Sequence, residues 1–316
     1  MLLPSMPPLP IVYHPDYVTP LPDQHRFPMP KFRLLYAYLQ QRGIAQPAAT
    51  FRPEPADPAL LQQVHSPDYV RAYLTGTLDP KAQRRIGLPW SPGLVTRTCT
   101  AVGGTVLTAQ LALKYGIACN TAGGTHHAFP DYGSGFCIFN DLAIAARTLL
   151  NGGTVQKVLI LDLDVHQGDG TAWIFRDEPR VFTFSMHCEA NFPGKKQVSD
   201  RDIPLPIGLG DQDYLHILKR EFPPLLAQVQ PDLVLYDAGV DVHGGDRLGK
   251  LALTDSGIYQ RDRLVLHHCR QGGYPIATVI GGGYAPDIHA LVARHALLHR
   301  AAHSEFNARV SNHNIS

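Results

Sequence analysis

Short apolar runs, rich in leucine and β-branched residues, recur along the chain after its first third. Such runs between polar turns predict strands that are buried on both faces of a sheet. They cover residues 116–119, 157–163, 180–186, 232–236 and 275–280. Other segments carry apolar residues at helical spacing. These predicted helices cover residues 31–41, 69–74, 96–115, 141–150, 169–176, 211–229 and 255–271. Strands that alternate with helices predict a mostly parallel central sheet with helices on both faces, an α/β fold.

No internal repeat and no long linker interrupts this pattern. We therefore expect a single α/β domain over residues 1–316. Residues 1–30 are rich in proline and are expected to be mostly non-regular. Residues 303–316 are expected to form a loose C-terminal tail.

The composition excludes several classes of protein. The chain has 316 residues, of which 44% are hydrophobic and 17% charged, so it can bury a large core and is not a disordered chain. Its net charge is +1, so no direct nucleic-acid binding is expected. No apolar run approaches the roughly 20 residues that span a bilayer, and the N-terminus lacks the basic region of a signal peptide. Five cysteines without a CxxC pair favour a reducing cytoplasm.

Polar residues follow several of the predicted strands. Ligands of open parallel sheets bind beyond the carboxyl ends of the strands. Asp164 and His166 follow the strand at 157–163, and Asp241 follows the strand at 232–236. Three such ligands would leave one position open for water, as in catalytic zinc sites, although the oxygen ligands would also suit manganese or iron. Taken singly, each of these residues could equally be a structural residue and not a metal ligand: an aspartate that caps a helix, a hydrogen-bonded histidine or an aspartate in a turn.

Two further aspartates are notable. Asp162 lies inside a predicted buried strand, where a carboxylate is costly unless it is paired. A hydrogen bond to one of the adjacent histidines, His126 or His127, would offset that cost. Asp169 could serve the other histidine in the same way, or it could cap the helix that follows it.

Five segments in order resemble the zinc-dependent histone deacetylase family, which has the arginase–deacetylase α/β fold. They are GGTHHAFPDYGSGFCIFND (123–141), LDLDVHQGDGT (161–171), FSMHCEANFPG (184–194), DAGVDVHGGDRLG (237–249) and GGGYAPDI (281–288). The HQGDG form, together with residues 25–39 and 64–70, most resembles class IV and its bacterial relatives. His25 and Arg26 are expected to lie in a solvated loop.

The resemblance implies one Zn²⁺ bound by Asp164, His166 and Asp241. The other catalytic residues that it implies are two tandem histidines with their carboxylate partners and a tyrosine that polarises the acyl carbonyl: His126 with Asp162, His127 with Asp169, and Tyr284. The implied substrate-binding residues are Gly135, Phe136, Phe192, Gly282 and Gly283. A monovalent cation, K⁺, is implied at Asp162 and Ser185, with His187 as a structural neighbour.

The sequence thus predicts a zinc-dependent amidohydrolase that removes acetyl or longer acyl groups from acyl-lysine or related acylated amines. The family's rim aspartate has no clean match in residues 76–95, which leaves peptide and small-amine substrates both open. One alternative is an arginase-like di-manganese ureohydrolase, but Gly168 stands where its DxHxD pattern has the second aspartate. The other alternative is a non-catalytic acyl-lysine binder. The oligomeric state is left open.

Overall fold

The computed structural model describes the backbone of residues 8–313 and the side chains of residues 8–308. Its centre is one sheet in which every strand pair is parallel, as predicted. The strand order is β2-β1-β3-β8-β7-β4-β5-β6. The strands are β1 (Ile11–Val12), β2 (Thr50–Phe51), β3 (Ile117–Asn120), β4 (Val158–Asp162), β5 (Val181–Cys188), β6 (Arg201–Leu205), β7 (Leu233–Asp237) and β8 (Ile276–Val279).

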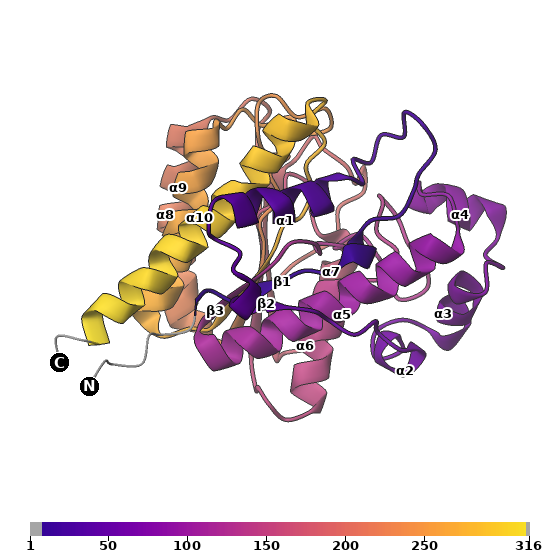
Figure 1. Ribbon diagram of the computed structural model, residues 1–316, viewed down its shortest axis with the longest axis horizontal. Coiled ribbons are helices and arrows are strands. Elements are labelled where there is room, and N and C mark those ends of the chain that lie inside the picture. The colour runs from indigo at the N-terminus through magenta and orange to yellow at the C-terminus, as the bar shows by residue number, and fades with distance from the viewer. Residues whose placement is uncertain (1–7, 314–316) are drawn as a thin grey trace.

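Helices cover both faces of the sheet. The α-helices are α1 (Lys31–Gln41), α2 (Pro58–Leu61), α3 (Pro67–Leu74), α4 (Pro80–Ile86), α5 (Pro92–Tyr115), α6 (Asp141–Asn151), α7 (Asp169–Phe175), α8 (Asp211–Val229), α9 (Asp255–Gly272) and α10 (Ile288–His313), and the 3₁₀ helices are η1 (Pro15–Tyr17) and η2 (Pro47–Ala49). Figure 1 shows α1, α8, α9 and α10 gathered on one side of the sheet and α5 and α6 on the other. The helices and the sheet enclose one contiguous apolar core, which agrees with a single domain.

Several elements differ from the sequence-based expectation. The strands β1, β2 and β6 were not predicted, because they are short or lie at the edge of the sheet, where the pattern of burial is weak. The expected loose tail is wrong for residues 303–313, which continue α10 and bury Glu305 and Phe306. Residues 314–316 lie outside the described part of the chain, as do residues 1–7. No helix within the described residues is long and apolar enough to cross a membrane.

The register of the sheet brings the functional loops to one level. Asp162 at the end of β4 is paired with Asp237 at the end of β7, and Asp237 is paired with Val279 at the end of β8. Parallel strands that end together place the loops that follow them side by side. These loops carry the residues that were predicted from the motifs.

A buried arginine on α9 binds the main chain of two of these loops. Arg261 on α9 is fully buried, and its guanidinium donates to the main-chain carbonyls of Leu163 at 3.2 Å, Gly239 at 2.6 Å and Ala238 at 3.2 Å. It also donates to Asp262 at 2.9 Å. The residues after β4 and β7 are therefore fixed by hydrogen bonds from one side chain that the sequence analysis did not identify.

Candidate active site

The three predicted metal ligands come together at the carboxyl ends of the central strands. Asp164, His166 and Asp241 are buried and offer ligand atoms that all lie within 4.8 Å of one another. The Nδ1 atom of His166 lies 3.0 Å from Asp164 Oδ1 and 3.2 Å from Asp241 Oδ2. Burial, with the nearby Asp164 carboxylate, raises the pKa of Asp241 to about 7. Two carboxylates buried side by side are unfavourable unless a cation offsets their repulsion.

The surroundings of this cluster fit a divalent ion. Asp241 Oδ2 accepts no hydrogen bond from any described residue. Gly282 donates its N–H to Asp164 Oδ2 at 2.7 Å, and a Cβ at Gly282 would overlap the carboxylate of Asp241. The backbone thus approaches both carboxylates closely and leaves their remaining lone pairs for a ligand. Two aspartates and one histidine form a donor set that zinc accepts.

The tandem histidines each have a carboxylate partner. His126 Nδ1 lies 2.7 Å from Asp162 Oδ2, and His127 Nδ1 lies 2.6 Å from Asp169 Oδ1. The two Nε2 atoms are 3.1 Å apart. Asp169 is the first residue of α7, but the helix cap is Gly168, so the Asp169 side chain serves His127 instead. These contacts fix both rings and turn their Nε2 atoms toward each other.

The two histidines differ in protonation. Burial, together with the positive charge on His126, lowers the pKa of His127 to about 4. Burial also lowers the pKa of His126, but the carboxylates of Asp162 and Asp164 outweigh it and raise that pKa well above its usual value. Without a bound metal, His127 is therefore neutral at pH 7 and His126 is protonated.

A second acidic cluster lies beside the first. Asp162 is paired with Ser185 on β5 and with Asp237 on β7, so the three residues stand in one row across neighbouring strands. Asp162, Asp237 and His126 offer ligand atoms within 4.8 Å of one another. Asp237 is fully buried, and neither of its carboxylate oxygens accepts a hydrogen bond from the described residues. The sequence analysis missed Asp237, although a carboxylate at the end of a buried strand was the signal it used for Asp162.

The Ser185 hydroxyl lies 3.0 Å from His187 Nδ1, and burial lowers the pKa of His187. His187 is thus adjacent to the row formed by Asp162, Ser185 and Asp237.

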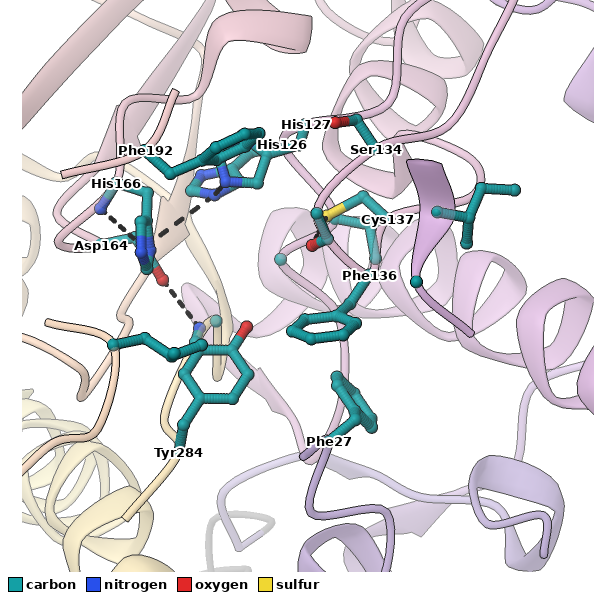
Figure 2. Close-up of a pocket in the computed structure, with 18 of the residues that line it drawn as sticks. Phe27, His126, His127, Ser134, Phe136, Cys137, Asp164, His166, Phe192 and Tyr284 are labelled. Carbon is teal, nitrogen blue, oxygen red and sulfur yellow. Dashed lines mark hydrogen bonds and ion pairs between the residues drawn. The ribbon is translucent and has the colours of Figure 1, made fainter. Parts of the chain in front are cut away.

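A cavity of about 500 Å³ opens beside the cluster of potential metal ligands, of which Asp164 and His166 line it. The predicted aromatic residues line it: Phe192 is 45% exposed and meets the His127 ring edge-on at 4.9 Å, and Phe136 lies 5.8 Å from the Tyr284 ring. Figure 2 shows Tyr284 across the cavity from the tandem histidines, with its hydroxyl turned inward. Gly135 also lines the cavity, and its positive φ of 54° brings the backbone close to His127.

The N-terminal segment contributes residues that the sequence analysis did not assign. Phe27 lies 5.4 Å from the Phe136 ring, and His25 Nε2 lies 3.0 Å from the Gly87 carbonyl, so His25 is not solvated as expected, whereas Arg26 is exposed in the loop before α1. Lys31 is buried, and its ammonium group donates to the carbonyls of Gly281 and Gly283 at 3.4 Å. Burial lowers the pKa of Lys31 to about 8. No clear signal in the sequence pointed to this role, because Arg33 follows two residues later in the same helix and lysine is common at helix surfaces.

The chain is similar to proteins of one family. Residues 25–299 match the model of the histone deacetylase domain. The chain is 68% identical to an uncharacterized protein of Picosynechococcus over 93% of its length and 98% of the relative. It is 31% identical to the acetoin utilization protein AcuC of Staphylococcus aureus, over 83% of this chain and 73% of the relative. It is 28% identical to Histone deacetylase 2 of Arabidopsis thaliana, over 85% of this chain and 72% of the relative.

The fold is also similar to solved structures. An HDAC homolog from Aquifex aeolicus matches with a TM-score of 0.81 at 26% identity over 94% of this chain and 84% of the other. An HDAC homolog complexed with SAHA matches with a TM-score of 0.82 at 25% identity and the same coverage. The motifs, the fold and these similarities agree: the chain belongs to the histone deacetylase family of hydrolases, which has the arginase–deacetylase fold.

Proposed function

We propose that this protein is a zinc-dependent deacylase that hydrolyses the amide bond of acyl-lysine or a related acylated amine. One observation carries the proposal: the buried cluster of Asp164, His166 and Asp241 faces a cavity that also holds two carboxylate-paired histidines and Tyr284. A zinc ion bound to that cluster would supply Lewis acidity to the acyl carbonyl and would lower the pKa of a water molecule.

His127 is the proposed general base. Its pKa of about 4 leaves Nε2 unprotonated at neutral pH, and Asp169 holds the ring by its Nδ1–H. Nε2 takes the proton of the attacking water and then delivers a proton to the leaving amine. His126, held at 2.7 Å from Asp162, would stabilise the negative charge that develops at the reaction centre.

Tyr284 is the proposed hydrogen-bond donor to the acyl oxygen. Burial and the carboxylates of Asp241 and Asp164 raise its pKa well above the usual value, so its hydroxyl remains protonated and can donate. Such a donor stabilises the oxyanion that forms when water attacks the carbonyl. The Gly135 carbonyl would accept from the substrate amide N–H, while the rings of Phe136 and Phe192 would enclose the apolar stem of lysine. Gly282 would form the wall beside Tyr284, whereas Gly283, the other glycine expected to bind substrate, is not among the described residues that line the cavity.

Three further features belong to this proposal. A structural K⁺ ion would bind at Asp162 and Ser185, beside Asp237, whose buried carboxylate accepts no hydrogen bond from the described residues. All five cysteines are buried free thiols, which supports a reducing cytoplasm. The HQGDG motif supports assignment to class IV.

The test combines metal analysis with a substrate panel. The purified protein should contain one zinc ion per chain by inductively coupled plasma mass spectrometry. It should release acid from at least one of acetyl-, butyryl-, octanoyl- or myristoyl-lysine peptides or acetylated polyamines, and a hydroxamate should inhibit it. Two manganese ions per chain would favour a ureohydrolase, and a zinc-loaded protein that hydrolyses no substrate in the panel would favour a binding protein.

A further inference from the structure

The opening of the cavity carries positive charge. Four of its lining residues are exposed cationic side chains, and an exposed lining residue lies where the cavity meets solvent. They come from separate parts of the chain: the loop before α1, the last turn of α4 and the loop between β7 and α9. We call this group the cationic rim: Arg26, Arg84, Arg85 and Lys250.

No carboxylate neutralises the cationic rim. None of its four side chains forms an ion pair with another described residue. Their contacts are with rings and main chain instead. The Arg85 guanidinium lies 4.6 Å from the centre of the Tyr132 ring, the Arg26 guanidinium lies 5.9 Å from that of Phe136, and Lys250 Nζ donates to the Ala190 carbonyl at 2.8 Å. Each cation therefore keeps its charge available to a ligand.

Neither Asp164 nor Asp246 forms an ion pair with the cationic rim. Asp164, at the metal cluster, is the one carboxylate among the described residues that line the cavity. The carboxylate of Asp246 accepts main-chain N–H groups of Leu248 at 2.9 Å, Gly249 at 3.1 Å and Tyr284 at 2.7 Å. Because the whole chain has a net charge of only +1, the cationic rim is a local asymmetry and not a consequence of a basic composition.

We propose that the cationic rim selects acyl-lysine flanked by carboxylates, in an acidic peptide segment, over acylated polyamines. This inference rests on the deacylase function proposed above. Oppositely charged surfaces attract each other and speed encounter, whereas like charges that face each other oppose binding. An acylated polyamine keeps further ammonium groups, which the cationic rim would repel. The side chains of Asp or Glu beside the acyl-lysine would instead lie against arginine and lysine.

The test compares matched substrates of the zinc-loaded enzyme. Three peptides share one acyl-lysine and differ only in the two residues on each side, which are acidic, neutral or basic, and an acylated polyamine is the fourth substrate. At 20 mM salt, we expect kcat/KM to be at least about tenfold higher for the acidic peptide than for the basic peptide. At 0.5 M salt, the ratio of these two kcat/KM values should shrink toward one, because salt screens exposed charges. The polyamine should be the poorest substrate.

Charge reversal tests the residues. Arg84→Glu and Lys250→Glu should each reduce the ratio of acidic to neutral peptide about fourfold, since one pair of unit charges about 10 Å apart in water changes an equilibrium about twofold and the substitution turns an attraction into a repulsion. The rate on the neutral peptide should stay within about twofold. Lys157→Glu is the matched control. Lys157 is exposed and directly precedes β4, at the amino ends of the strands, whereas the site lies at their carboxyl ends. It should leave the ratio unchanged.

The outcomes separate this inference from the proposed function. Hydrolysis of the neutral peptide with no preference for the acidic one, or a polyamine hydrolysed faster than every peptide, would overturn the inference and leave the deacylase function standing. Competitive inhibition by a single-stranded oligonucleotide stronger than that by a non-acylated acidic peptide would assign the cationic rim to nucleic acid instead. If none of the four substrates is hydrolysed by the zinc-loaded enzyme, the proposed function fails first.

Discussion

Replacing Arg261 with methionine should both destabilise the protein and weaken its metal site. The guanidinium bonds three main-chain carbonyls beside Asp164 and Asp241, and its Nε–H donates to Asp262. Methionine fills most of the same volume but donates no hydrogen bond. The substitution therefore removes the hydrogen bonds without leaving a large cavity.

The expected loss in the free energy of unfolding is about 3–5 kcal/mol, the cost of leaving one member of a buried ion pair without its partner. Asp262 is fully buried, and burial raises its pKa while Arg261 opposes that rise. Without Arg261 the pKa of Asp262 rises further, so the folded state binds a proton more readily than the unfolded state. Stability of the variant relative to the wild type should therefore improve as the pH falls from 8 to 5.

Urea unfolding at pH 8 and pH 5 measures these differences, and metal analysis after dialysis measures retention of the ion. Arg261→Met combined with Asp262→Asn should recover part of the loss and leave about 1–3 kcal/mol for the unpaired carbonyls. Arg263→Met is the control on the same helix: its side chain is 62% exposed and lies 3.7 Å from Glu305, so it should change stability by less than about 0.5 kcal/mol. A loss below about 1 kcal/mol in Arg261→Met with full metal content would refute this reasoning.

Three other substitutions test the site directly. Tyr284→Phe should lower kcat by about 10²–10³ with metal content unchanged, because it removes one donor to the oxyanion; near-normal kcat would exclude that role. Gly282→Ala places a Cβ against the carboxylate of Asp241 and should weaken metal binding by roughly 10- to 100-fold in a chelator competition; unchanged affinity would contradict the close packing. Asp169 raises the pKa of His127, so Asp169→Asn should lower that pKa, shift the acidic limb of the kcat profile to lower pH and reduce kcat; a shift to higher pH would be inconsistent with His127 as the base.

Local patterns in the sequence were sufficient for the central strands and the main helices. The apolar runs at β4, β5, β7 and β8 are long enough for burial on both faces to be evident, and α8 spans the predicted 211–229. The motif residues also follow these strands directly in the sequence. Because parallel strands end at one edge, the convergence of these residues could be expected from the order of the motifs and strands alone.

Contacts between residues far apart in the sequence determined the rest. The two-residue strands β1 and β2 depend on partners far away in the sequence, since β1 pairs with β3 and β2 pairs with β1. Arg261 and Leu163 are 98 positions apart, and Lys31 and Gly281 are 250 apart. A buried charge is tolerated only where the folded chain supplies hydrogen bonds or opposite charge, and no local pattern records where those partners are. The sequence by itself thus determined which groups could perform the chemistry, while the tertiary structure decided what holds them in place and which charges surround the opening of the cavity.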